Sequence, residues 1–341
     1  MTVLARRLRS QLLSGPPARA AVSVAERLLA VQAQDPRGAR LAVRARPAGG
    51  RAADVDRALT EDRSLVVSWL NRGTLHLVCS EDYPWLHQLT TPQLFVGNAR
   101  RLAQEGVPPA AADRGVDAVV QALATDGPLV RAQLRERVAA AGVPTQGQAL
   151  VHVLMLASLR GLVVRGPVVG REQAFVLVSD WLPPGRALGR EQALTELARR
   201  YLTGHGPAGA ADLARWAGVP LRDARTGFGA VAAELSRSPD GLWDLADRPA
   251  SPPACPPPRL LGAFEPVLLG WTSRSDITGD NQDLVTDNGI FRPFAMVEGR
   301  AVATWAMPRG EVVLSRFHRL DASTEDALAA EAMAVKQFLA D

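Results

Sequence analysis

The sequence predicts an α+β fold built from tandem units in which helices precede a short β-hairpin. Two observations support this prediction. The pattern GP-x3-A-x-L begins at Gly127 and again at Gly206, and a weaker copy begins at Gly15. In the two stronger copies one helical segment precedes the pattern, another follows it, and a β-prone stretch comes last. Helices followed by a hairpin describe a winged helix, which is a form of helix-turn-helix, so we expect three of them in tandem.

The first elements follow from hydrophobic spacing and from residues that start or stop helices. Apolar residues three to four apart predict a surface helix over residues 3–14. Ser23 and Glu26 fit an S-x-x-E capping box, which predicts the start of the next helix. Pro36 disfavours helical backbone at the residue before it, so this helix is expected to end at about Gln34. A short basic segment should follow.

The remaining elements are assigned from periodicity, β-propensity and turn residues. The turn at Asn71, Arg72 and Gly73 separates two β-rich runs and predicts a hairpin, and Pro92 predicts a kink in the helix that follows it. Helices are expected at 53–61, 80–102, 116–125, 146–160, 191–203, 221–235 and 324–339, and strands at 64–69, 74–78, 162–178, 241–246, 291–297, 301–306 and 312–314.

These elements divide the chain into four expected parts. Residues 1–106 form the first winged helix with a connecting helix, residues 107–185 the second, and residues 186–248 the third. Residues 249–341 form a C-terminal β-rich region with a hairpin and a terminal helix. The proline-rich stretch 249–258 is expected to act as a semi-rigid spacer.

The composition is typical of a soluble globular protein with two or three domains. The chain has 341 residues, of which 47% are hydrophobic, and it has neither an apolar run of membrane length nor a signal-peptide pattern at its start. Cys79 and Cys255 have no paired spacing, which argues against a disulfide framework or a zinc site. We therefore expect reduced thiols in a cytoplasmic protein.

Neither a metal nor a cofactor is expected. The five histidines show no ligand spacing such as H-E-x-x-H, and no G-x-x-x-x-G-K-[ST] loop is present to hold a nucleotide. Both absences argue against metal-assisted hydrolysis and nucleotide-driven chemistry.

Positive charge is concentrated in one segment. The net charge is only +4, and Lys336 is the only lysine. Between Pro36 and Ala53 there are five arginines and no acid. They are Arg37, Arg40, Arg44, Arg46 and Arg51. The segment is either a solvated loop in an arginine-biased protein or a surface that positions DNA phosphates without reading sequence.

Two glutamines precede this basic segment. Residues two apart on a regular helix point to different sides, so Gln32 and Gln34 converge on one site most easily at a frayed helix end. The alternative is a pair of solvated glutamines with no common role.

Three segments carry a family resemblance that extends over nearly the whole chain. The runs LLAVQAQDPRGARLAVRARP, LVVSWLNRGTLHLVCSEDYPWL and GIFRPFAMVEGRAVATW resemble the AlkZ/YcaQ family of winged-helix DNA glycosylases. In that family a Gln-x-Gln or Gln-x-Asp pair carries the catalysis, and Gln32 and Gln34 match the Gln-x-Gln, AlkZ-like form. The resemblance implies winged helices arranged in a C-shape and a C-terminal hairpin that reaches into the DNA groove. Arg292 and Arg300 would be its contacts, unless the hairpin is an ordinary sheet edge.

The resemblance implies a chemistry that amides can perform. An N7-alkylated purine is already cationic and leaves without protonation, so the enzyme must hold a water molecule and stabilise positive charge on the sugar. Amide oxygens suit both tasks. We expect Gln34 to orient the water and Gln32 to support it or the sugar. Asp35 is a stronger base next to them, and Arg72 and His76 are candidates for support, although a lone strand histidine is more often structural.

The lysine count predicts a monofunctional enzyme. Glycosylases that also cleave the backbone form a Schiff base through an amine, and Lys336 and the α-amino group are the only candidates here. The product should be an abasic site in double-stranded DNA. The resemblance favours bulky or cross-linked alkylpurines as substrates. The biological role would be self-resistance to a genotoxic alkylating metabolite. We expect a monomer that associates with the nucleoid when it is bound to DNA.

Two other classes of function stay open. A transcriptional regulator without catalysis would bind a preferred operator through base-reading side chains. A scaffold whose winged helices bind protein would show negligible, salt-insensitive affinity for DNA.

Overall fold

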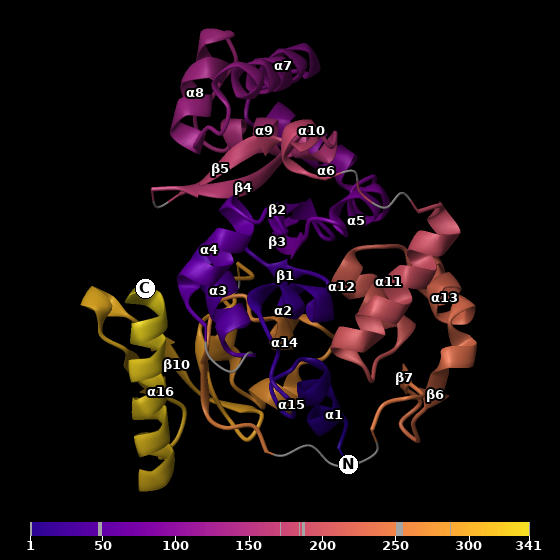
Figure 1. The fold of residues 1–341 in the computed structure, drawn as a ribbon, viewed down its shortest axis with the longest axis vertical. Coiled ribbons are helices and arrows are strands. Elements are labelled where there is room, and N and C mark those ends of the chain that lie inside the picture. The colour runs from indigo at the N-terminus through magenta and orange to yellow at the C-terminus, as the bar shows by residue number, and fades with distance from the viewer. Residues whose placement is uncertain are drawn as a thin grey trace. The chain divides into compact units, whose positions relative to one another are not determined.

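The computed structural model describes residues 2–46, 50–170, 172–183, 185, 188–249, 255–286 and 288–340. The predicted α+β class is confirmed (Figure 1). The chain forms two compact units, one of residues 56–188 and one of residues 1–55 together with 189–341. The expected first domain, 1–106, is therefore divided between the two units, and the other expected boundaries stay predictions. Part of the expected spacer, residues 250–254, lies outside the described residues.

The unit of residues 56–188 combines an antiparallel sheet with helices. Its elements are β2 (Leu65–Leu70), β3 (Thr74–Cys79), α5 (Tyr83–Thr90), α6 (Leu94–Gln104), α7 (Pro109–Asp126), α8 (Arg131–Ala140), α9 (Ala149–Leu159), β4 (Val163–Val169), β5 (Glu172–Leu177) and α10 (Val178–Trp181). Strands β3, β2, β4 and β5 are adjacent in that order. The predicted hairpin is β2–β3. The expected helix over 80–102 is two helices, α5 and α6, because Pro92 interrupts it, and it starts at Tyr83 rather than at Ser80.

The second unit holds both ends of the chain. From the N-terminal part come α1 (Val3–Ser10), α2 (Ala21–Leu28), β1 (Val31–Gln32), α3 (Pro36–Arg44) and the start of α4 (Ala52–Thr60). From the C-terminal part come α11 (Arg190–His205), α12 (Ala210–Ala217), α13 (Leu221–Ala230), β6 (Leu235–Arg237), β7 (Trp243–Leu245), β8 (Arg259–Leu261), α14 (Pro266–Leu269), α15 (Ser275–Thr278), β9 (Phe294–Val297), β10 (Arg300–Ala306), β11 (Val313–Arg316) and α16 (Ala322–Ala340).

The repeated GP pattern has the same structural role in both copies. After α7, Leu129 forms an isolated antiparallel bridge to Phe175 of β5, and after α11, Ala208 forms one to Trp243 of β7. Three helices and a hairpin surround each bridge: α7, α8, α9 with β4–β5, and α11, α12, α13 with β6–β7. This is the element order of a winged helix, and the short segment that starts with Gly-Pro pairs with its hairpin.

The C-terminal region forms a second sheet with the strand order β11, β10, β9, β8. Helix α16 runs beside β10 (Figure 1) and packs through Leu328, Val335 and Phe338 on a core that includes Trp305. The indole of Trp305 donates to the Leu261 carbonyl at 2.8 Å, which ties β10 to β8. No helix in the described ranges is both long and apolar enough to cross a bilayer.

Candidate active site

The glutamine pair lies in an extended connection between two helices, and the expected helix end at Gln34 is wrong. Helix α2 runs from Ala21 to Leu28, so Ser23 lies inside it and does not cap it. The chain turns at Leu29, which is fully buried and has φ of +65°. Such a conformation is strained for leucine and needs surrounding structure to hold it. After this turn β1 is extended through Gln32.

Pro36 starts a helix instead of terminating one. It is the first residue of α3, where the missing N–H of proline leaves no hydrogen bond unmade. The basic segment that follows it is therefore helix α3 rather than a loop. The same fact explains the position of Asp35, which is the N-cap of α3 and accepts a hydrogen bond at 3.0 Å from the Arg37 backbone N–H. One oxygen of the Asp35 carboxylate is thus committed to the helix.

The two amides are in direct contact. Gln32 Nε2 donates to Gln34 Oε1 at 2.7 Å. Residues two apart face the same side of an extended chain, so the strand-like backbone brings the pair together. Gln32 is 6% exposed and Gln34 is exposed. One amide is therefore fixed in the interior and aligns the other at the surface.

The backbone of α3, the helix that follows the glutamine pair, lies very close to the backbone of the chain that follows β8. A Cβ on Gly38 would overlap the carbonyl oxygen of Ala263, and a Cβ on Gly262 would lie 2.8 Å from Gly38 Cα. Helix α3 can therefore lie directly on the chain that follows β8 only because both residues are glycine.

Replacing Gly38 with alanine is expected to destabilise the protein by about 1–3 kcal/mol, because the new methyl group meets backbone that cannot move aside. Urea unfolding would measure the change. Gly97 in α6 is the matched control, since a Cβ there meets nothing within 4 Å. Its replacement should stabilise α6 by up to about 1 kcal/mol. Equal effects of the two substitutions would contradict the packing argument.

A second hairpin of the C-terminal sheet lies beside α3. The Arg37 guanidinium contacts the sulfur of Met307 and lies 5.6 Å from the ring centre of Trp305. Met307 begins the turn between β10 and β11, in which Arg309 is exposed with φ of +52°. Sequence reasoning missed Met307 and Arg309. The turn signal Pro308-Arg309-Gly310 before the expected strand 312–314 could have located them.

Two of the six arginines predicted to contact DNA have another role. Arg44 pairs with Glu331 through two hydrogen bonds of 2.7 and 2.9 Å. Arg46 is fully buried against Glu265 at 2.6 Å. Neither guanidinium can reach a phosphate from these positions, so their assignment as DNA contacts is corrected. Arg37 and Arg40 are half-buried on α3 and stay candidates.

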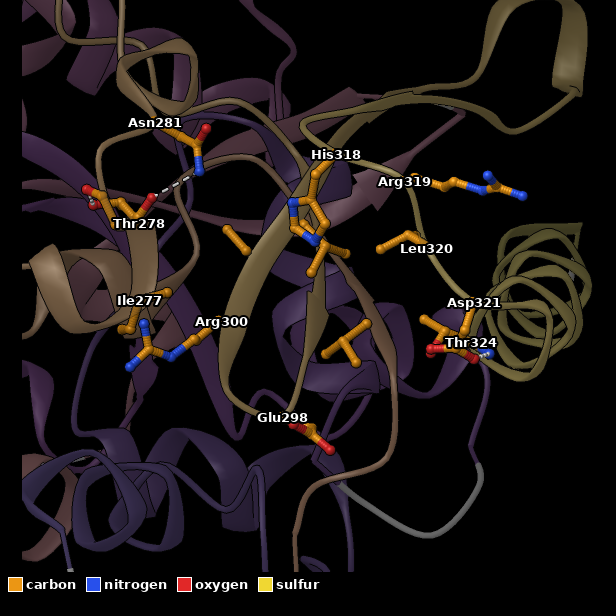
Figure 2. Close-up of a pocket in the computed structure, with 14 residues that line it drawn as sticks. Ile277, Thr278, Asn281, Glu298, Arg300, His318, Arg319, Leu320, Asp321 and Thr324 are labelled. Carbon is orange, nitrogen blue, oxygen red and sulfur yellow. Dashed lines mark hydrogen bonds between the residues drawn. The ribbon is translucent and has the colours of Figure 1, made fainter.

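The predicted DNA hairpin, β9–β10, is packed at its turn. A Cβ on Gly299 would overlap the side chain of Leu8 and approach that of Leu4, so the turn lies on α1 and does not project. Arg292 and Arg300 are exposed. Arg300 lines a cavity of about 450 Å³ and is the first residue of β10. Arg37 lies near the other end of this strand, where it contacts Met307. His318 lines the same cavity (Figure 2).

His76 and Arg72 belong to the other unit. His76 on β3 is 3% exposed, and its Nδ1 lies 2.9 Å from the Thr74 carbonyl oxygen. This contact requires Nδ1 to donate, which leaves a lone pair on Nε2. Burial, with a smaller contribution from Arg72, lowers the His76 pKa to about 3. The imidazole is therefore neutral at physiological pH, while Arg72 is exposed at the hairpin turn.

Acid should destabilise the protein through its buried histidines. Burial lowers the pKa of His205 to about 3 as well. Because both folded-state values lie below the ordinary 6.5, the unfolded chain binds more protons, so stability is complete above pH 6.5 and falls as pH is lowered toward 3. The expected slope is about 1.4 kcal/mol per pH unit for each histidine. Urea unfolding between pH 7 and 5 would measure it, and an unchanged slope in His76→Gln would contradict this origin.

An oriented amide pair beside arginines, on a scaffold with the winged-helix element order, has the features of a DNA-processing enzyme. The sequence model of the family described as DNA glycosylase AlkZ-like matches residues 25–338. The chain belongs to this family, which confirms the predicted class, a hydrolase of the DNA N-glycosylase type.

Two comparisons with proteins of Streptomyces sahachiroi agree. The chain is 28% identical over 339 residues to its interstrand DNA cross-link repair glycosylase, covering 92% of this chain and 90% of that protein. It is also similar to the solved structure of the Streptomyces sahachiroi DNA glycosylase AlkZ, with a TM-score of 0.79, 26% identity, and coverage of 98% of this chain and 95% of the other.

Proposed function

We propose that this protein hydrolyses the N-glycosidic bond of N7-alkylated purines in double-stranded DNA, including bulky or interstrand cross-linked adducts, and leaves an abasic site. The observation that carries the proposal is the 2.7 Å hydrogen bond from Gln32 to the exposed Gln34. The relative named as an interstrand cross-link repair glycosylase supports the class of lesion.

The two glutamines have different roles: Gln34 contacts the reacting water, and Gln32 positions Gln34. Gln34 Oε1 accepts one hydrogen bond from Gln32 and keeps a second lone pair, which can accept a hydrogen bond from a water molecule. Because Gln32 is buried, it holds the Gln34 amide in one orientation before substrate arrives. The oriented water then forms a bond to the sugar carbon as the bond from that carbon to the base breaks. The cationic base departs as a neutral alkylpurine, and the proton of the attacking water passes to solvent. The amide dipole stabilises the positive charge that develops on the sugar.

Arginines near the pair would hold the DNA backbone. Arg37 and Arg40 lie on the helix that follows Gln34, and Arg309 lies at the exposed turn next to Met307. We assign these three guanidiniums to phosphate contacts, which position the duplex without reading its sequence. Arg72 and His76 remain candidates for supporting the reaction, His76 through the acceptor nitrogen of its neutral ring.

The test is a reaction with duplex DNA that carries N7-alkylguanine. Free alkylated base and abasic sites that break only on heating are the expected products. Lys336 is held by Glu311 through contacts of 2.7 and 2.9 Å, so we expect no covalent enzyme–DNA adduct on borohydride treatment. Strand cleavage without heat would contradict a monofunctional mechanism. Binding without base release would favour the second candidate, a non-catalytic DNA-binding regulator, which the element order of the winged helices supports.

The biological role would be self-resistance to a genotoxic alkylating metabolite. We place the enzyme in the cytoplasm, on the nucleoid when bound to DNA, and as a monomer. Protection of cells against an N7-alkylating agent by expression of the protein would support this role, and protection by the Gln34→Ala variant to the same degree would contradict it.

A further inference from the structure

A cavity of about 740 Å³, whose lining does not include Gln32 or Gln34, lies in the unit that holds both chain ends. It is formed by α1, the end of α2, the last turns of α11 and the chain after β7. Four arginines line it: Arg9, Arg27, Arg199 and Arg248. The proposed reaction makes no use of this cavity. None of these four arginines is among the residues that the family resemblance assigns to catalysis or to DNA contact.

The four cations differ in how their charge is balanced. Arg199 is neutralised by Glu234, with hydrogen bonds of 2.8 and 2.7 Å. Arg248 is paired with Asp244. Arg27 has no acidic partner among the described residues, although it is half-buried. Its pKa is lowered first by burial and then by Arg248 and Arg9, so its surroundings repel its charge instead of balancing it.

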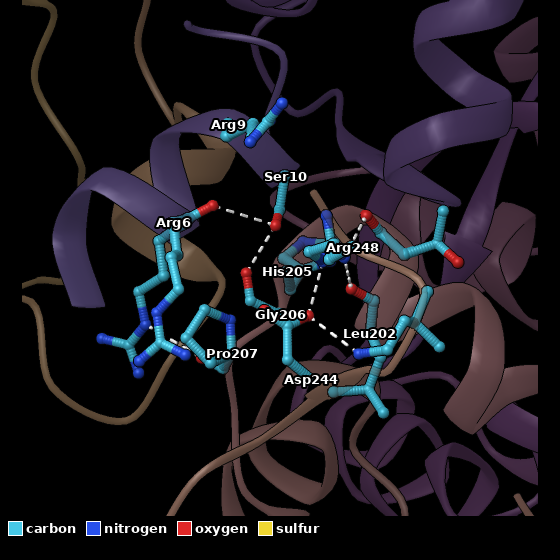
Figure 3. A network of polar contacts seen from close by, with 12 residues as sticks. Arg6, Arg9, Ser10, Leu202, His205, Gly206, Pro207, Asp244 and Arg248 are labelled. Carbon is cyan, nitrogen blue, oxygen red and sulfur yellow. Dashed lines mark hydrogen bonds and ion pairs between the residues drawn. The ribbon is translucent and has the colours of Figure 1, made fainter. Parts of the chain in front are cut away.

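The guanidiniums are held in place before any ligand binds. Arg248 donates to the Leu202 carbonyl oxygen and to Asp244 (Figure 3). It also donates to the Thr203 carbonyl oxygen at 3.0 Å. Arg9 donates to the Pro249 carbonyl at 3.1 Å. A Cβ on Gly204 would overlap the carbonyl oxygen of Arg27, so α11 lies directly on the end of α2. This contact fixes the backbone position from which the Arg27 side chain extends.

We propose that this cavity binds a phosphate group, held by Arg27 with Arg9 and Arg248 around it. A phosphate supplies the anionic partner that Arg27 does not have among the described residues. Its oxygens match the planar hydrogen-bond donors of a guanidinium. Asp247 also lines the cavity. Its carboxylate limits how much negative charge a ligand in the cavity can carry, which favours a single phosphate over a polyanion. The phosphate belongs either to the backbone of bound DNA or to a free phosphorylated small molecule.

Inorganic phosphate is the first probe, with thermal unfolding of the full chain as the readout. Phosphate should raise the Tm saturably above its value in chloride at equal ionic strength. Arg27→Met keeps the buried stem, removes the charge, and should abolish this rise. Arg114→Met is the matched control, because Arg114 is exposed on α7 and donates to the Ala110 carbonyl oxygen of its own helix. Arg9→Met is the second variant if Arg27→Met does not fold.

Binding to undamaged duplex DNA at several salt concentrations separates the two sources. If the phosphate is part of DNA, Arg27→Met should reduce the slope of log K against log salt by about one, and free phosphate should compete. If it is a small molecule, the variant should lose phosphate stabilisation and bind DNA as the wild type does. Lack of a phosphate-specific Tm rise in the wild type, or its equal loss in Arg114→Met, overturns the proposal. Neither readout uses base release, so the proposed glycosylase activity is tested separately.

Discussion

Replacing Glu265 with alanine should lower the free energy of unfolding by about 3–5 kcal/mol, because it leaves a buried cation without its partner. Both side chains of the Arg46–Glu265 pair are 0% exposed, and their closest atoms are 2.6 Å apart. Arg46 also donates to the backbone carbonyl and the side-chain oxygen of Gln11, at 2.8 and 3.0 Å. The pair therefore joins α1, the end of α3 and the chain before α14. Urea unfolding followed by circular dichroism would measure the loss.

Two comparisons make this prediction specific. Glu325→Ala removes an acid that binds Arg316 through two contacts at the surface, and it should leave the unfolding midpoint near that of the wild type. The double replacement Arg46→Met with Glu265→Leu removes both buried charges and should recover much of the lost stability. A loss below about 1 kcal/mol in Glu265→Ala would mean that solvent reaches Arg46, contrary to its burial.

The sequence predicted elements that depend on local patterns. The hairpin at Asn71 to Gly73 forms as β2–β3, and the GP pattern marks equivalent short bridges at Leu129 and Ala208. Both signals come from turn chemistry and periodicity, which act over a few residues.

Features set by distant residues were not predictable. Arg46 resembled a phosphate contact because its partner, Glu265, is 219 residues away in sequence. Pro36 was interpreted as a helix stop, although proline is equally suited to the first position of a helix. The turn at Leu29 follows directly after the end of α2 on which α11 packs, and no local pattern reveals that packing. The convergence of Gln32 and Gln34 was predicted, but through a frayed helix, whereas the structure achieves it with extended backbone.

Gln34→Ala should reduce release of N7-alkylguanine at least about tenfold, which corresponds to about 1.4 kcal/mol of transition-state stabilisation. The reason is loss of the only exposed amide of the pair, whose oxygen is proposed to hold the attacking water. Single-turnover base release would measure the rate, and DNA affinity should survive because no backbone-binding arginine changes. Gln337→Ala, which removes an exposed glutamine on α16, is the matched control and should release base at the wild-type rate.

Gln32 is proposed to act through Gln34, and a double replacement tests this relation. Gln32→Ala should lower kcat and leave KM nearly unchanged, because Gln32 is buried and orients the reacting amide instead of binding DNA. If that is its only role, the double variant should be no slower than Gln34→Ala alone, since nothing is left to orient. Losses that multiply would instead mean that Gln32 makes its own contact with the sugar or the water. A wild-type rate in Gln34→Ala would remove the pair from the mechanism.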